Sequence, residues 1–255
     1  MPLELVVIPC LTDNYAYLVH DAASGRAAVV DVPEAPPVLA ALSDRGWRLS
    51  DIWLTHHHWD HTDGVADLVA ATKARVTGAA TDAHRLPPLD HALSTGQDFD
   101  FAGHSVAVID VPGHTIGHIA FYIASERLAF TGDTLMAAGC GRMSEGNAPD
   151  YWQSLSRLAS LPADTLICSG HEYTAANLRF AQSLEPDAGP LMLRMARVAG
   201  LRAAGKPTVP VVLSEELATN PFLRAGAPAM KQALGMPAAT DAEAFAELRR
   251  RKDRF

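Results

Sequence analysis

Cysteine is scarce in this chain of 255 residues, and the three that occur, Cys10, Cys140 and Cys168, lie far apart. A small, odd and widely spaced set argues against the disulfide framework of small secreted domains and favours a reducing compartment. None of the three stands in a pattern expected of a nucleophile. We therefore expect a cytoplasmic protein with buried thiols.

Long apolar runs and excess positive charge are also missing. No stretch approaches the roughly 20 apolar residues that a helix needs to cross a bilayer. The first residues, Met-Pro-Leu-Glu-Leu-Val-Val, have no basic signal-peptide segment and are typical of a first strand. The formal net charge of −8 argues against a general nucleic-acid binder. We expect neither a membrane nor a nucleic acid as a partner.

Histidine, by contrast, is concentrated at one place. Residues 55–61 read Thr-His-His-His-Trp-Asp-His, directly after the apolar run 52–54. Alternate side chains of an extended chain share a face, so His56 and His58 can converge on one cation. Asp60 and His61, past the strand end, can turn toward a second. The alternatives are a His-rich surface loop or an artificial tag, and a tag is not expected behind a buried strand inside the chain.

Three later loops supply matching ligands. His114, Asp133 and His171 each follow a short apolar strand and stand next to a glycine that lets the backbone approach closely. Imidazole and carboxylate are ligands for zinc, iron or manganese. Seven candidates are too many for one tetrahedral ion but suit two ions that share a carboxylate.

This set resembles the metallo-β-lactamase superfamily, whose pattern HxHxDH…H…D…H it matches position for position. Within that superfamily the chain is similar to glyoxalase II, the hydroxyacylglutathione hydrolases, over essentially its whole length. The closer resemblance rests on these segments: Asp13-Asn14-Tyr15, Thr55–His61, Gly132–Leu135, Gly139–Arg142, Gly170–Thr174, Asn220–Arg224 and Arg249–Asp253.

The periodicity of the chain agrees with that resemblance. Short β-like runs, such as residues 105–111, alternate with helices over the first two-thirds. Good helix formers at helical spacing, as at residues 175–184, dominate after Glu172. Thr240 and Glu243 match a capping box that opens a final helix. The resemblance implies an α/β fold, an αββα metallo-β-lactamase-like sandwich with a C-terminal all-helical domain. We place a metal-binding domain at residues 1–171 and a helical glutathione-binding domain at residues 172–255.

The resemblance also implies a role for each ligand. His56, His58 and His114 would bind one metal, Asp60, His61 and His171 the other, and Asp133 would bridge them. Asp60 and Asp133 are the residues we predict to be catalytic. Two divalent ions, zinc first with iron or manganese as alternatives, would lower the pKa of a shared water and produce the attacking hydroxide.

Four residues are predicted, by the same resemblance, to bind the thiol moiety: Arg142, Tyr173, Arg249 and Lys252. Arg249 and Lys252 are three residues apart and so lie on one helix face. The alternative for these two is a solvated helix end whose cations complement the helix dipole. Ser144 departs from the family, because some members have an aromatic residue there, and this puts one substrate contact in doubt.

Three other residues near the ligands receive different expectations. His57 lies between two ligands and is expected to point away from the metals. His118 corresponds to a family position near the site, although a packed, hydrogen-bonded histidine is at least as good an interpretation. Trp59 is expected to pack beneath the ligand loop.

The predicted function is hydrolysis of S-(2-hydroxyacyl)glutathione thioesters, chiefly S-D-lactoylglutathione, to glutathione and D-lactate by a monomer. Within the superfamily the alternatives are a hydrolase of lactones, lactams or phosphodiesters, and a persulfide dioxygenase. A non-catalytic metal-binding or redox-sensing protein is a further alternative. A structural metal site is normally closed and four-coordinate, and seven ligand positions argue against it.

Overall fold

The chain folds into two units in this computed structural model, which describes residues 2–94, 96–186 and 188–255. The first unit comprises Met1–Asp110 and Gly117–Gly132, and the second unit comprises Val111–Ile116 and Asp133–Phe255. This division follows contacts in space. It differs from the predicted domain boundary at residue 171, which stays a prediction.

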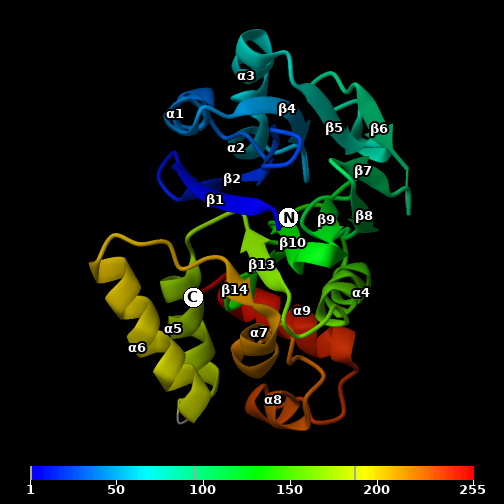
Figure 1. The fold of residues 1–255 in the computed structure, drawn as a ribbon. Coiled ribbons are helices and arrows are strands. Elements are labelled where there is room, and N and C mark those ends of the chain that lie inside the picture. Colours follow the sequence, from blue (N-terminus) through cyan, green and yellow to red (C-terminus); the bar gives the residue numbers. More distant parts are fainter. Residues whose placement is uncertain (1, 95, 187) are drawn as a thin grey trace. The chain divides into compact units, whose positions relative to one another are not determined.

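A mixed sheet forms one layer of the first unit, in the strand order β1-β2-β3-β4-β5-β6 (Figure 1). Strands β1 to β3 pair antiparallel, whereas β3 to β6 pair parallel. The strands are β1 (Glu4–Cys10), β2 (Asn14–Asp21), β3 (Arg26–Val30), β4 (Arg48–Trp53), β5 (Arg75–Ala79) and β6 (His91–Leu93). The helices between them are α1 (Ala35–Arg45), α2 (Trp59–Thr62), α3 (Val65–Thr72) and the 3₁₀ turn η1 (Ala80–Asp82).

A second, antiparallel set of strands in the same unit has the order β10-β9-β8-β7. Its elements are β7 (Phe99–Phe101), β8 (His104–Asp110), β9 (Ile119–Ile123), the 3₁₀ turn η2 (Ala124–Glu126) and β10 (Leu128–Gly132). Trp53 of β4 joins the two layers, with its ring centroid 5.3 Å from that of Phe101 and 5.6 Å from that of Phe121. The neighbouring Ile52 belongs to the cluster that includes Val38 of α1 and Leu68 of α3. Alternation along β4 therefore produces a helix–sheet–sheet stack.

The second unit is mainly helical after residue 173, as the sequence predicts (Figure 1). The hairpin of β11 (Leu135–Met136) and β12 (Gly139–Cys140) comes first, followed by α4 (Ala148–Ala159). Strand β13 (Leu166–Ser169) pairs antiparallel with β14 (Val211–Val212). The remaining helices are α5 (Thr174–Leu184), α6 (Gly189–Ala203), α7 (Leu213–Thr219), α8 (Pro228–Ala233) and α9 (Asp241–Lys252).

The β11–β12 hairpin is held by a buried ion pair between Arg194 of α6 and Glu216 of α7. Glu216 also accepts a hydrogen bond from the backbone N–H of Ala138, at 2.8 Å, in the turn of the hairpin. Asn220 donates to the carbonyl of Gly139 at 2.9 Å. A buried charge is stable only when it is paired and hydrogen-bonded, so these contacts fix the hairpin onto the helices.

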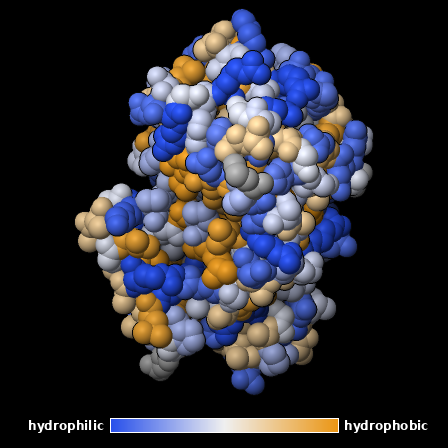
Figure 2. Space-filling model, in the orientation of Figure 1, coloured by the Kyte–Doolittle hydropathy of each residue, from blue (hydrophilic) through white to orange (hydrophobic). Residues whose placement is uncertain are grey.

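The surface of the second unit is partly apolar at α6. Figure 2 shows hydrophobic atoms among hydrophilic ones over this helix, and the side chain of Leu193 is 76% exposed. Scattered exposed apolar residues are ordinary on protein surfaces. No helix among the described residues is long and apolar enough to span a membrane.

Candidate metal centre

Four of the predicted ligands lie together in the first unit, where β4 ends. The chain leaves β4, passes His56 and His58 in extended form and turns back in the single helical turn α2, which carries Asp60 and His61. The ring centroid of His56 is 4.8 Å from that of His58 and 4.2 Å from that of His61. Asp60 Oδ2 lies 3.9 Å from His61 Nε2. Strand end and helical turn thus gather three imidazoles and a carboxylate.

Asp31, which sequence reasoning missed, orients one of these histidines, His61. It directly follows β3, the strand beside β4, and is buried with a left-handed φ of 55°. Its Oδ2 accepts from His61 Nδ1 at 2.9 Å and from the Thr55 hydroxyl at 2.8 Å. A carboxylate accepts only, so Nδ1 of a neutral His61 carries the proton and Nε2 is the nitrogen left free to bind a metal. The ligand atoms of Asp31, His56 and His61 all lie within 4.8 Å of one another.

Asn14 orients the side chain of Asp60 by hydrogen bonding. Its side-chain N–H donates to the backbone carbonyl of Asp60 at 2.9 Å and to Oδ2 at 3.1 Å. The segment Asp13-Asn14-Tyr15 entered the sequence argument only as a resemblance. The structure shows that Asn14 fixes the carboxylate of a predicted ligand.

Three residues lie next to the predicted ligands in the sequence or in space. The expectations for His57 and His118 are confirmed, and the expectation for Trp59 was wrong. His57 faces Asp82 Oδ2 at 2.9 Å, a structural partner outside the ligand group. His118 is buried, stacks on His56 at a centroid distance of 4.6 Å and donates to a backbone carbonyl. Trp59, however, is 64% exposed and does not pack beneath the ligand loop, because the buried residues of α2 are His61 and Thr62.

The other three predicted ligands meet in the second unit. Asp133 Oδ2 lies 3.5 Å from His114 Nε2 and 3.3 Å from His171 Nε2, and all three residues are buried. The Nδ1 of His114 lies 2.8 Å from the Arg142 carbonyl, which only accepts, so the proton of a neutral His114 sits on Nδ1. The Nε2 lone pair of His114 then faces a carboxylate oxygen. Such a contact is repulsive unless a cation lies between the two atoms.

This donor set fits divalent metal ions. Imidazole Nε2 atoms whose Nδ1 hydrogens are bound, at Asp31 and at the Arg142 carbonyl, are the form in which histidine ligates metals. The Asp133 oxygen between two imidazoles is placed as a shared ligand would be. The predicted ligands of the first unit and those of the second unit each combine nitrogen and oxygen donors, which zinc, iron and manganese all accept.

Comparison with known proteins places these observations in a family. Residues 12–171 match the family model described as "Metallo-beta-lactamase superfamily", and residues 172–255 match the model described as "Hydroxyacylglutathione hydrolase C-terminus". A protein named hydroxyacylglutathione hydrolase from Cereibacter sphaeroides (strain ATCC 17025 / ATH 2.4.3) is 64% identical over 255 residues, which is 100% of both chains. The chain belongs to the hydroxyacylglutathione hydrolases of the metallo-beta-lactamase superfamily.

Solved structures agree with that assignment. The structure of ETHE1 from Myxococcus xanthus matches with a TM-score of 0.69 and 23% identity, over 98% of this chain and 90% of that chain. The protein TTHA1623, solved in a di-iron-bound form, matches with a TM-score of 0.62 and 25% identity, over 86% of this chain and 99% of that chain. These likenesses confirm the αββα fold expected from the sequence, with its helical C-terminal part.

The residues that the hydrolase family predicts for substrate binding differ in accessibility. Arg142 and Tyr173 are exposed, and the Tyr173 ring stacks on the predicted ligand His171 at a centroid distance of 4.7 Å with planes only 4° apart. Lys252 is half-buried beside the ring of Phe180. Ser144, where some members have an aromatic residue, is exposed.

Arg249 is the exception, because its side chain is buried. Its Nη1 donates to the backbone carbonyls of Cys140, at 2.9 Å, and Gly141, at 3.3 Å, while Nε bonds Asp253 at 3.0 Å. Its guanidinium also lies 5.1 Å from the ring centroid of Phe222. Neighbouring Cys140 and Asp253 raise the pKa of Arg249 against the lowering effect of burial, which is the largest single influence. Direct substrate contact by Arg249 stays a prediction.

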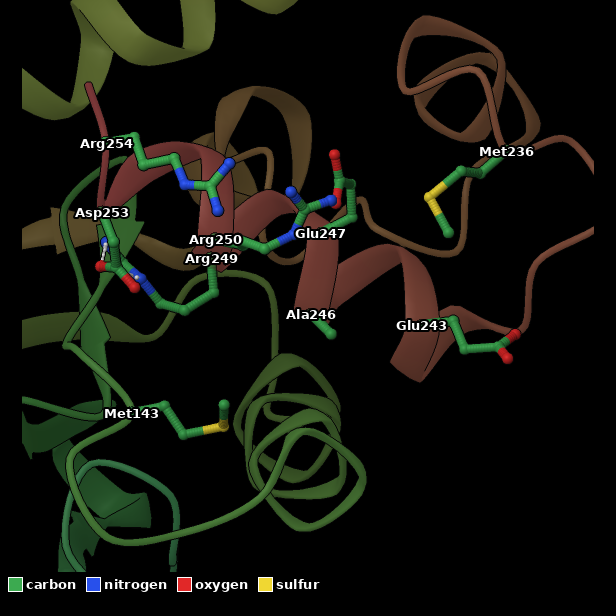
Figure 3. Close-up of a pocket in the computed structure, with 9 residues that line it drawn as sticks. All are labelled: Met143, Met236, Glu243, Ala246, Glu247, Arg249, Arg250, Asp253 and Arg254. Atoms are coloured by element: carbon green, nitrogen blue, oxygen red, sulfur yellow. Dashed lines mark hydrogen bonds and ion pairs between the residues drawn. The ribbon is translucent and has the colours of Figure 1, made fainter.

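A cavity of about 560 Å³ opens beside α9 (Figure 3). Met143, Met236 and seven residues on or just after α9 line it: Glu243, Ala246, Glu247, Arg249, Arg250, Asp253 and Arg254. Figure 3 shows Arg249 directed toward Asp253. The acidic and basic groups of its wall are largely paired with each other, as Glu247 is with Arg250. Arg249 belongs to this wall, whereas Arg142, Tyr173 and Lys252 do not.

The thiols of this hydrolase are poor nucleophiles. Burial, aided by Glu34, raises the pKa of Cys10 to about 12, and burial also raises the pKa values of Cys140 and Cys168. The nucleophilic form of cysteine is the thiolate, which these surroundings disfavour. These surroundings give no support to a thioester intermediate on any of the three thiols.

Proposed function

We propose that the chain hydrolyses S-(2-hydroxyacyl)glutathione thioesters, chiefly S-D-lactoylglutathione, to glutathione and D-lactate. The observation that carries this proposal is the full-length match, at 64% identity, to a protein named hydroxyacylglutathione hydrolase. That match includes residues 172–255, for which the family model is specific to these hydrolases.

The proposed cofactors are two divalent metal ions, zinc first, with iron or manganese as alternatives. His56, His58 and His114 would hold one, Asp60, His61 and His171 the other, and Asp133 would be shared. The placement of Asp133 Oδ2 between the Nε2 atoms of His114 and His171 supports the shared role. The di-iron form of TTHA1623 supports a centre of two ions. When bound, such ions lower the pKa of a water molecule and polarise the thioester carbonyl.

The chain itself contributes orientation and charge. Asp60, which accepts a hydrogen bond from Asn14, and Asp133 are the proposed catalytic carboxylates, because they would hold the metal ions that activate the attacking water. Arg142, Tyr173, Arg249 and Lys252 are proposed to hold the glutathione moiety. Local positive charge is needed there, since glutathione is anionic and the protein carries a net charge of −8. Thiolate is a good leaving group, so a strong side-chain acid is unnecessary.

The biological setting follows from this activity. We propose a monomeric cytoplasmic enzyme of methylglyoxal detoxification, with glutathione thioesters as partners and without nucleic-acid or membrane partners. Buried thiols at Cys10, Cys140 and Cys168 support a reducing compartment.

A substrate panel tests the proposal. The purified, metal-loaded protein would be assayed with S-D-lactoylglutathione, a lactone, a β-lactam, a phosphodiester and a glutathione persulfide. We expect efficient turnover of the thioester alone, and loss of that turnover in Asp133→Ala. Faster turnover of any other substrate would overturn the assignment in favour of the corresponding activity.

A further inference from the structure

Tyr151 of α4 is fully buried and has no part in the proposed metal or substrate contacts. Its hydroxyl lies among three backbone carbonyl oxygens: 3.0 Å from Thr134, 3.1 Å from Gly141 and 3.3 Å from Asp133. A phenol has a single hydrogen to donate, so these oxygens share one donor. Two of the three belong to the segment that begins with the ligand Asp133.

The ring of Tyr151 touches the segment of another ligand. A Cβ atom on Gly113, the residue before His114, would lie 2.2 Å from the ring Cγ. Only glycine allows this approach, and Gly113 also has a φ of 147°, which other residues rarely adopt. Three residues further along α4, Ser154 donates to the carbonyl of Pro112 at 2.7 Å. One face of α4 therefore supports the backbone that precedes His114.

Gly141 connects the two segments. Its N–H donates to the Asp133 carbonyl at 2.8 Å, and a Cβ on it would lie 2.9 Å from His114 Nδ1. The next residue, Arg142, offers its carbonyl to the same His114 nitrogen at 2.8 Å. The Gly141 carbonyl accepts from Tyr151 and, at 3.3 Å, from Arg249. The backbone that sets the orientation of His114 thus depends on the Tyr151 hydroxyl.

We propose that Tyr151 is a positioning residue of the metal centre, which holds the backbone of His114, Asp133 and Gly141 in one arrangement. The proposal rests on the proposed ligand roles of His114 and Asp133. Tyr151 touches neither substrate nor metal. Its effect is transmitted through the main chain, and the partners of metal ligands commonly contribute to affinity in this way.

The test is Tyr151→Phe, which deletes the hydroxyl and keeps the ring against Gly113 and the ring of Phe245, 5.2 Å away. Apoprotein would be titrated with Co²⁺ in competition with a chelator, and the d–d absorption of the cobalt protein would be recorded. We expect about tenfold weaker cobalt affinity and an altered spectrum. At saturating metal, kcat for lactoylglutathione should remain reduced with little change in KM. The matched control is Tyr122→Phe, because Tyr122 is also buried but its hydroxyl faces Arg127.

Two results separate the possible failures. If Tyr151→Phe has the same cobalt affinity and the same cobalt spectrum as Tyr122→Phe, the positioning role is overturned. Wild-type affinity in Asp133→Ala would instead overturn the ligand assignment, and neither measurement requires a thioester. If Tyr151→Phe does not fold, Ser154→Ala tests the same support of His114, and unchanged cobalt binding in that variant would overturn the proposal.

Discussion

At the scale of single residues, Lys252 combines a predicted role with an unusual environment. Its ammonium lies 5.4 Å from the ring centroid of Phe180 and 5.3 Å from that of Phe255, and it donates to the Ala176 carbonyl at 3.2 Å. Burial, followed by the nearby charges of Arg249 and Arg179, lowers the pKa of Lys252 to about 8. The cation is therefore present below that pH and is lost as the pH rises through it.

If Lys252 binds a glutathione carboxylate, the KM for lactoylglutathione should rise between pH 7 and pH 9. Lys252→Arg keeps its charge across this range and should abolish the rise, whereas Lys252→Met should have a high KM throughout. Loss of a hydrogen bond to a charged group costs about 1–3 kcal/mol, which is about 5- to 150-fold in KM. Steady-state kinetics of the three proteins would measure this, and kcat should change little because the contact is remote from the carbonyl.

The control for Lys252 is a small thioester without the glutathione moiety, which wild type and variants should hydrolyse equally. Added salt should raise KM in wild type more than in Lys252→Met, because it screens the charge. An unchanged KM in Lys252→Met at pH 7 and low salt would mean that Lys252 has only a structural role at the end of α9 and does not bind glutathione.

At the scale of elements, α9 begins with a capping box that the sequence predicted and the structure confirms. Thr240 Oγ1 accepts from the Glu243 N–H at 3.3 Å, and Glu243 Oε2 accepts from the Thr240 N–H at 2.8 Å. The backbone and hydroxyl of Thr240 lower the pKa of Glu243. The bond that the Glu243 carboxylate accepts is therefore at full strength at neutral pH and weakens as the pH falls through that lowered pKa, whereas the bond to Thr240 Oγ1 does not titrate.

Thr240→Ala should lower the free energy of unfolding by about 1 kcal/mol, the usual cost of losing an N-cap side chain. Urea denaturation of the metal-loaded protein at pH 7 would measure the change. The exposed Thr81 provides the matched control, since Thr81→Ala removes the same atoms without a helix cap. Equal stability of the two variants would contradict the capping role, and kcat should be unchanged in both.

Longer elements were predictable and the shortest were not. The predicted helix at residues 175–184 corresponds to α5, Thr174–Leu184, and the predicted strand at residues 105–111 corresponds to β8, His104–Asp110. Two-residue strands such as β11, β12 and β14 are too short to show an alternating pattern in the sequence. Strand β14 in addition pairs with β13, which lies far away along the chain. The observed ends of these elements differ from the predicted ends by about a residue or two, because capping contacts decide where an element ends.

At the scale of the whole molecule, the same distinction applies to the site. The proposed ligands could be named from the sequence because each follows a strand end in a local pattern with a known spacing. Their supports could not, because Asp31 reaches His61 through the neighbouring strand and Asn14 reaches Asp60 across 46 positions of the chain. Tyr151 is the extreme case, since a single buried tyrosine in a helix looks like ordinary core in the sequence. Hydrogen bonds between distant segments become visible only once the topology is known.

The metal content is a property of the whole chain, because the proposed ligands come from both units. Seven ligands with one shared carboxylate predict two equivalents of metal per chain, measured by elemental analysis after saturation and removal of excess ions. Asp133→Ala should retain less than one equivalent and no thioesterase activity, since that residue would serve both ions. Asp67→Ala, a change at an exposed carboxylate on α3, should retain two. A stoichiometry fixed at one after saturation with zinc, iron or manganese would exclude the two-ion centre, and a one-metal mechanism would then have to explain why Asp133 faces two histidines at 3.3 and 3.5 Å.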